Sequence, residues 1–144
     1  MTVASILKHK GYNVTTVDPS MRIREVVALL AEREIGSVLV IDRTEQLLGI
    51  VSERDIVRSL AANGVDTLDM SAGQLMTRAL QVVHPGTTEA EAMRVMTVGR
   101  FRHLPVLDKG VLVGLVSIGD VVKARLMQQE SEVDSLKAYV AGSI

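Results

Sequence analysis

The chain has 144 residues, of which 47% are hydrophobic and only 2% aromatic, which predicts one compact domain or two very small ones with an aliphatic core. Its 16 basic and 17 acidic residues give a net charge of −1, which argues against a general nucleic-acid binder. There is no cysteine, no apolar run long enough for a membrane helix and no signal-peptide pattern, so we expect a cytoplasmic protein without disulfides, thiolate chemistry or membrane contact.

The first half of the chain predicts a helix over residues 1–10 and then one β-α-β-β-α unit. The segment "NVTTVDP" is a short strand that ends at Pro19, because proline favours extended geometry in the residue before it. An amphipathic helix follows, with Val26 and Leu30 on one face and Ser20 as a candidate N-cap. Two apolar strands, "SVLVI" and "LLGIVS", are joined by the polar turn "DRTEQ", and "ERDIVRSLAAN" is the closing helix.

The second half repeats this order after a short linker with a helical turn over residues 72–76. "LQVVHP" is the entering strand, and Ala92 and Met96 lie on one face of a helix that Thr87 or Thr88 caps. "HLPVL" and "VLVGLVS" are the paired strands, and a long helix beginning at "IGDVV" closes the unit.

The last helix carries an apolar seam with one polar member, spaced 4-3-4-3-4, at Val122, Leu126, Gln129, Val133, Leu136 and Val140. This spacing fits two interpretations. The seam packs on its own domain, or it is a contact between two copies of the chain.

The two halves have modest identity, but their patterns of residues agree in order. When residues 16–43 are moved by 66 positions they fall on residues 82–109, and the matches include Val17 with Val83 and Pro19 with Pro85. The element "GIVSERD" (49–55) then returns as "GLVSIGD" (114–120). A repeat of this length indicates a unit that cannot bury its apolar face alone.

The doubled unit, the doubled Gly-apolar-Val-Ser-x-x-Asp element and the stretch "FRHLPVLDKGVLVGLVSIGDVV" resemble a tandem pair of CBS domains, the cystathionine-β-synthase-type module, from about Val3 to Leu126. The last stretch is similar to small stand-alone bacterial and organellar CBS-pair proteins. The resemblance implies an α+β fold in which two repeats pack about a pseudo-two-fold axis as a Bateman module. The expected division is 1–69 for the first repeat with its N-terminal helix, 70–128 for the second repeat, and 129–144 for a helical extension.

The same resemblance implies a function. Clefts of CBS pairs commonly hold adenosine-containing ligands such as AMP, ADP, ATP, S-adenosylmethionine or NAD(H). The pairs commonly form homodimers, and they sense energy state and regulate a separate protein, which the sequence does not name. Catalysis is not their typical role, so we expect no enzyme, no metal and no nucleic-acid partner.

The Ser-x-x-Asp elements are candidate ribose contacts. Asp55 and Asp120 are expected in the first turn of a helix, where the helix dipole favours a carboxylate that also accepts hydrogen bonds from a diol. Ser52 and Ser117 add hydroxyl groups. A serine followed three residues later by an acid is also an ordinary helix cap, and the two roles are compatible.

The adenine slot is placed by the resemblance at the entering strand and at the start of the middle strand of each repeat. These positions are Thr16, Val17, Ile35, Ser37, Val38, Val82, Val83, Leu104 and Pro105. Pro105 lacks a backbone N–H, as in an edge strand or a bulge, where backbone groups stay available to a ligand.

Phosphate contacts are expected from Arg54 in the first repeat and from Arg102 and His103 in the second, because arginine binds phosphate in a bidentate manner. The two repeats differ here, since Gly119 stands at the place of Arg54. We therefore predict two unequal sites, with Arg54 and Arg102 converging on one nucleotide. Each arginine is alternatively a solvated surface residue.

Two other functions stay open. The first is a structural interaction module without a ligand, in which the Ser-x-x-Asp elements only cap helices. The second is an enzyme acting on a nucleotide, which the scattered histidines and the absence of a glycine-rich phosphate loop disfavour.

Overall fold

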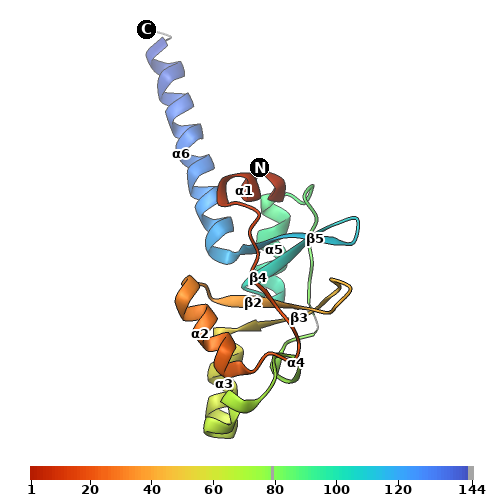
Figure 1. The fold of residues 1–144 in the computed structure, drawn as a ribbon. Coiled ribbons are helices and arrows are strands. Elements are labelled where there is room, and N and C mark those ends of the chain that lie inside the picture. Colours follow the sequence, from red (N-terminus) through yellow and green to blue (C-terminus); the bar gives the residue numbers. More distant parts are fainter. Residues whose placement is uncertain (79, 143–144) are drawn as a thin grey trace. The chain divides into compact units, whose positions relative to one another are not determined.

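A computed structural model describes residues 1–78 and 80–142, and the chain divides into two compact units. Unit 1 contains Met1–Tyr12, Gln81–Lys109 and the chain from Val113 onward, and unit 2 contains Asn13–Leu80 with Gly110–Leu112. Figure 1 shows the order of helices and strands along the chain.

Unit 2 is built around a three-stranded sheet in the order β1-β2-β3. Strand β1 runs parallel to β2, and β2 runs antiparallel to β3 with Val38 opposite Val51. Its elements are β1 (Thr16–Val17), α2 (Ile23–Arg33), β2 (Ser37–Ile41), β3 (Leu47–Ser52), α3 (Glu53–Asn63), the 3-10 helix η1 (Gly64–Asp69) and α4 (Ala72–Leu75). Apolar side chains from the sheet and from α2 and α3 form one core, which includes Val17, Ile23, Val26 and Ile56.

Unit 1 combines the second repeat with the first helix of the chain. Its elements are α1 (Val3–Lys10), α5 (Glu89–Gly99), β4 (His103–Asp108), β5 (Val111–Ser117) and α6 (Ile118–Gly142). Val83 bridges Val106 of β4 in parallel, as β1 pairs with β2 in the other unit, so the second entering strand is reduced to one bridge.

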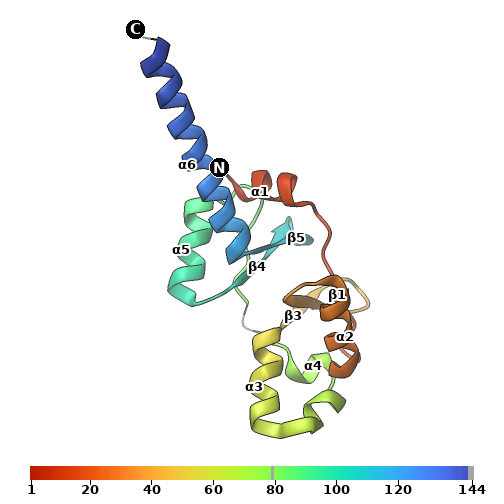
Figure 2. The same cartoon turned by 90° about the vertical axis from the view of Figure 1, so that its left-hand side faces the viewer.

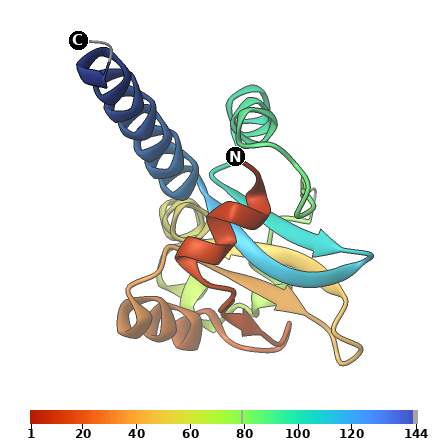
Figure 3. The ribbon, with the colours of Figure 1, turned by 90° about the horizontal axis from the view of Figure 1, so that it is seen from above.

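Helix α1 packs with the elements of the second repeat. It contributes Val3, Ile6 and Leu7 to the core of unit 1, and the N–H of Val3 donates to the carbonyl of Thr87 at 2.8 Å. Figure 3 shows α1 lying across β5. Chain order would assign α1 to the first repeat, as the expected division at 69 and 128 does. That division stays a prediction about the repeats, whereas contacts place the helix in unit 1.

The predicted α+β class and the two repeats are confirmed, and β2, β3, β5 and α3 begin and end where the sequence placed them. The predicted cap at Ser20 is wrong. Helix α2 has Arg22 at its N-cap, and Ser20 instead donates to Asp18 in the turn before the helix. The N–H of Ile23 donates to the carbonyl of Met70, so the linker backbone replaces the missing side-chain cap. Thr88 does cap α5.

The glycine that opens each repeated element allows a close approach. A Cβ atom on Gly49 would lie 2.7 Å from the carbonyl oxygen of Thr77, whose backbone pairs with Ile50 in an isolated bridge. A Cβ atom on Gly114 would lie 2.8 Å from the terminal methyl groups of Leu7. A flexible side-chain end can move, whereas a hydrogen-bonded backbone carbonyl cannot move without breaking its bridge.

We therefore predict that Gly49→Ala destabilises the protein more than Gly114→Ala does. Overpacking against backbone costs about 1–3 kcal/mol, whereas at Gly114 the loss of chain entropy in the unfolded state offsets much of a smaller clash. Urea denaturation of the two variants measures the difference, and equal midpoints would contradict the role assigned to Thr77.

Candidate functional site

Both Ser-x-x-Asp elements form the junction between a strand and the following helix. In unit 2, the N–H of Asp55 donates to Ser52 Oγ at 3.2 Å, and the N–H of Ser52 donates to Asp55 Oδ2 at 2.9 Å. Thr77 Oγ1 also donates to Asp55 Oδ1 at 3.3 Å. Both carboxylate oxygens of Asp55 thus have partners within unit 2.

In unit 1 the same junction joins β5 to α6. The N–H of Asp120 donates to Ser117 Oγ at 3.1 Å, and the N–H of Ser117 donates to Asp120 Oδ2 at 2.8 Å. The start of α6 is also fixed to the backbone just before β4, because the N–H of Ile118 donates to the carbonyl of Arg102. In unit 2 the N–H of Glu53 donates in the same way to the carbonyl of Gly36, just before β2. The capping interpretation is correct at both sites, and it leaves a ligand role open.

Asp120 has a charged partner, Lys10, whereas the hydrogen bonds of Asp55 described above come from the neutral groups of Ser52 and Thr77. Lys10 Nζ, at the end of α1, donates to Asp120 Oδ2 at 2.5 Å and to the carbonyl of Leu115 at 2.7 Å. The side chains of Lys10 and Asp120 keep 33% and 23% of their surface exposed, so the pair lies at a partly open position. Lys10 therefore joins the end of α1 to the start of α6.

This environment changes the ionisation of Asp120. Partial burial raises the pKa of the Asp120 carboxyl group, but the hydrogen bond from Lys10, the N–H of Ser117 and the charge of Lys10 outweigh burial. The net result is a pKa below the ordinary 3.8. Asp120 is consequently a carboxylate throughout the physiological pH range, and it can accept hydrogen bonds from hydroxyl groups.

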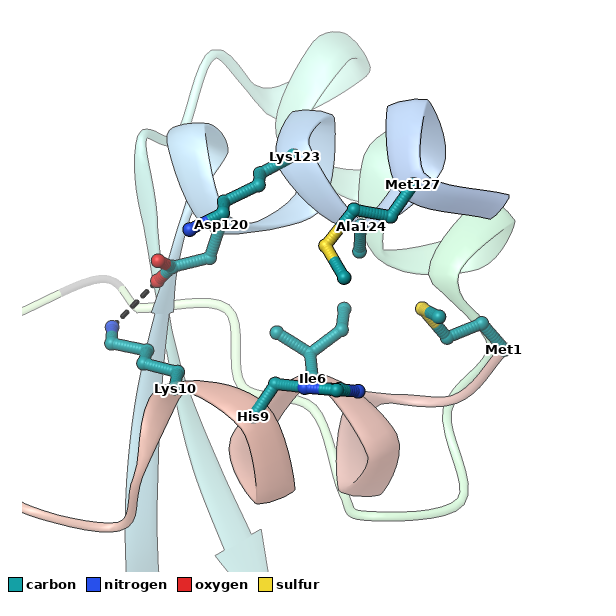
Figure 4. A pocket seen from close by; sticks show the side chains of 8 residues that line it. All are labelled: Met1, Ile6, His9, Lys10, Asp120, Lys123, Ala124 and Met127. Atoms are coloured by element: carbon teal, nitrogen blue, oxygen red, sulfur yellow. Dashed lines mark hydrogen bonds and ion pairs between the residues drawn. The ribbon is translucent and has the colours of Figure 1, made fainter. Parts of the chain in front are cut away.

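A cavity of about 410 Å³ adjoins this ion pair within unit 1. Its volume falls in the range of small-molecule sites. Figure 4 shows Lys10 and Asp120 at one end, with Ile6 and Ala124 between them and Met1. The lining combines apolar side chains with three basic residues and one acid: Met1, Ile6, His9, Lys10, Asp120, Lys123, Ala124 and Met127.

The residues expected to form the adenine slot are mostly buried in their own units. Val17 and Val38 belong to the core of unit 2, and Val83 and Leu104 to the core of unit 1. Ser37 and Pro105 are buried, Ile35 is half-buried, and Thr16 and Val82 are exposed. Because the side chains of the buried residues pack in the cores, these residues can offer a nucleotide base mainly their backbone groups.

Pro105 lies where its missing N–H disturbs little. Its carbonyl accepts the N–H of Val83 at 3.0 Å, on the side of β4 that carries the single bridge. The missing N–H therefore lies on the side of β4 away from β5, with which β4 forms a two-stranded sheet.

The residues expected at the phosphates lie next to the junctions. Arg54 is exposed in the first turn of α3, and Arg102 is exposed beside the start of β4, where its carbonyl holds Ile118. His103 is half-buried at the start of β4. The convergence of Arg54 with Arg102 concerns two different units and stays a prediction.

Sequence reasoning missed Lys10, Lys123 and the apolar lining from α1. The segment "LKHK" was visible as a small basic cluster. Its relevance depends on the packing of α1 with the second repeat, and neither the repeat nor the helical period indicates this packing.

Comparison with known proteins gives the family. A model described as the CBS domain matches residues 3–62 and again residues 72–127. The chain belongs to the CBS-domain family. The mitochondrial CBS domain-containing protein CBSX3 of Arabidopsis thaliana is 34% identical over 152 residues, which cover 98% of this chain and 72% of that protein.

Solved structures of CBS proteins have the same fold. The CBS-domain protein ATU1752 of Agrobacterium tumefaciens is 42% identical with a TM-score of 0.84, over 86% of this chain and 92% of its own. The structure of CBSX2 in complex with AMP is 31% identical with a TM-score of 0.72, over 89% of this chain and 98% of its own. The resemblance to a CBS pair is thereby confirmed.

Two further properties concern residues 1–78 and 80–142 of this CBS pair. Within these ranges, the helices are either too short or too polar to cross a membrane. Across the same described residues, His, Asp and Glu side chains form no group of three suited to a metal ion.

We predict that Lys10→Met raises the pKa of Asp120. The variant removes the hydrogen bond and the charge that lower this pKa and leaves the effect of burial. Because the folded-state pKa of Asp120 is lowered, its contribution to stability is complete above about pH 4 and is lost as the pH falls through the folded pKa. A ¹³C carboxyl titration by NMR measures the shift.

The control for this titration is Lys8→Met, which changes an exposed lysine of the same helix. It should leave the titration of Asp120 as in the wild type. An unchanged Asp120 pKa in Lys10→Met would show that the ion pair does not form in solution.

Proposed function

We propose that this CBS pair is a regulatory module that binds an adenine nucleotide of the AMP, ATP or NAD(H) type and signals to a separate partner protein. The observation that carries the proposal is the position of Asp120, an ionised acceptor at the wall of a cavity with three basic residues and an apolar lining. The AMP bound to CBSX2, a relative in structure, supports the same ligand class.

The cavity offers what each part of a nucleotide requires. The Asp120 carboxylate accepts hydrogen bonds from a ribose diol. Lys10, Lys123 and His9, which line this cavity, supply donors for phosphate. Ile6, Ala124 and Met127 provide apolar surface for a base. No metal or catalytic group is required, in keeping with a regulatory role and not an enzymatic one.

Lys10 gives such a site a route to a signal. A ribose diol that engages both oxygens of Asp120 competes with Lys10 at Oδ2, and Lys10 also holds the carbonyl of Leu115. Displacement removes a bond between the end of α1 and the start of α6. A ligand shifts such an equilibrium only when it binds the two states with different affinity, and competition for Asp120 supplies that difference.

The alternative is a ligand-free interaction module that dimerises or binds a protein partner. The hydrogen bonds that both oxygens of Asp55 accept within unit 2 favour it, because a carboxylate with partners on both oxygens has less need of a ligand. Binding measurements on the two aspartates separate the two functions.

We predict that nucleotide-stripped protein binds AMP, and that Asp120→Ala weakens this binding about 10–100-fold, the loss of a hydrogen bond to a charged group. Isothermal titration with AMP, ATP, NADH and S-adenosylmethionine identifies the ligand. Asp108→Ala removes an exposed acid of the same unit and serves as the matched control.

Asp55→Ala shows whether unit 2 contributes to binding, because it removes the equivalent helix cap. If none of the four ligands binds to the wild-type protein, the interaction-module function replaces the proposal.

We further predict that replacing both Arg54 and Arg102 with alanine lowers the affinity for AMP about 10–100-fold and leaves adenosine binding unchanged. Adenosine lacks the phosphate, so it isolates the charge-assisted contacts. Isothermal titration with both ligands gives the ratio. Equal losses for AMP and adenosine, or none for either, would remove these arginines from the phosphate site.

A further inference from the structure

Helix α6 extends beyond the core of unit 1, against which only its first turns pack. Val121 and Ala124, near its start, are buried in the core of unit 1. From there the helix continues past α1 and α5 of the same unit (Figures 1 and 2). Along this part Leu126, Val133 and Leu136 expose 55%, 50% and 63% of their surface.

These exposed residues lie in one seam. The spacing places Leu126 and Val133 at heptad position a, and Gln129 and Leu136 at position d. Val133 at a with Leu136 at d is the combination that favours two parallel strands. Leu126 occupies the other a position, and the polar Gln129 occupies the other d position. The seam therefore has the chemistry of a surface that pairs with its own copy.

The charges beside the seam distinguish parallel from antiparallel pairing. Arg125 and Glu132 occupy position g, and Glu130 and Lys137 occupy position e. In a parallel pair each g residue faces the e residue five positions further along the other helix. Arg125 then meets Glu130, and Glu132 meets Lys137, so all four contacts of the pair are attractive.

Antiparallel pairing of the same seam gives the opposite result. With Leu126 packed against Leu136, Glu130 faces Glu130 and Glu132 faces Glu132 across the interface. Like charges at these positions disfavour the arrangement. Arg125 already lies 3.5 Å from Glu89 in its own unit, so Glu132 and Lys137 carry most of the discrimination.

We propose that α6 pairs with α6 of a second copy of this chain as a short, parallel, two-stranded coiled coil in register. The pairing begins near Leu126 and continues along the seam through Leu136. This interface lies outside the nucleotide cavity, and it does not rest on nucleotide binding.

Cysteine cross-linking tests the proposal on the full chain, because the sequence has no cysteine of its own. Leu136→Cys places one thiol in the seam, where two copies bring the Cα atoms within disulfide reach. Ala138→Cys places the thiol at position f, on the outer face of the same turn. In a glutathione redox buffer we expect at least about tenfold more covalent dimer from Leu136→Cys, because pairing raises the effective thiol concentration.

Charge exchange gives a second readout in the Leu136→Cys background. Glu132→Lys should reduce cross-linking at low salt, since it places a lysine opposite Lys137 of the second copy. Adding Lys137→Glu to it should restore cross-linking. If Glu132→Lys reduced cross-linking only by disturbing the helix, adding Lys137→Glu would not restore it.

Two results would overturn the proposal. One is equal cross-linking of Leu136→Cys and Ala138→Cys, which means that the seam faces solvent or another partner. The other is preferential cross-linking of Leu136→Cys to a size-tagged Leu126→Cys chain, which requires antiparallel helices.

Discussion

Both units depend on one junction, in which a serine ends a strand and an aspartate closes the first turn of the next helix. The reciprocal backbone bonds of this box measure between 2.8 and 3.2 Å in the two units. The first helical N–H is tied to the carbonyl of Gly36 or Arg102. Strand, helix and carboxylate therefore form one rigid corner, so that a ligand bound to the carboxylate, as proposed, would act directly on the backbone.

The placement of α1 makes one of these corners different from the other. Because α1 packs with the second repeat, its last turn lies beside the start of α6, and Lys10 pairs with Asp120. At the other corner the partner of Asp55 is the neutral hydroxyl of Thr77. The repeated sequence thus folds into two corners with unlike electrostatics, and the unequal nucleotide sites expected from the arginines stay a prediction.

The sequence predicted local structure well because local rules determine it. The apolar runs, the turn residues and the Ser-x-x-Asp caps placed β2, β3, β5 and α3 at their observed bounds. The prediction failed at Ser20, where the backbone of Met70 caps α2 in place of a side chain. Lys10 and the lining of the cavity could not be predicted, because they depend on which unit α1 joins, and α1 fits either repeat by its apolar period.

The seam of α6 shows how function can be encoded outside the repeated unit. The repeat ends where α6 leaves the core, so no symmetry requirement determines the residues beyond Leu126. A solvated helix does not need leucine and valine at heptad spacing with opposite charges on either side, and three exposed apolar residues are unfavourable without a partner. Since Asp120 and this seam lie on one continuous helix, the site that would sense a nucleotide is joined by rigid backbone to the surface that would join two copies.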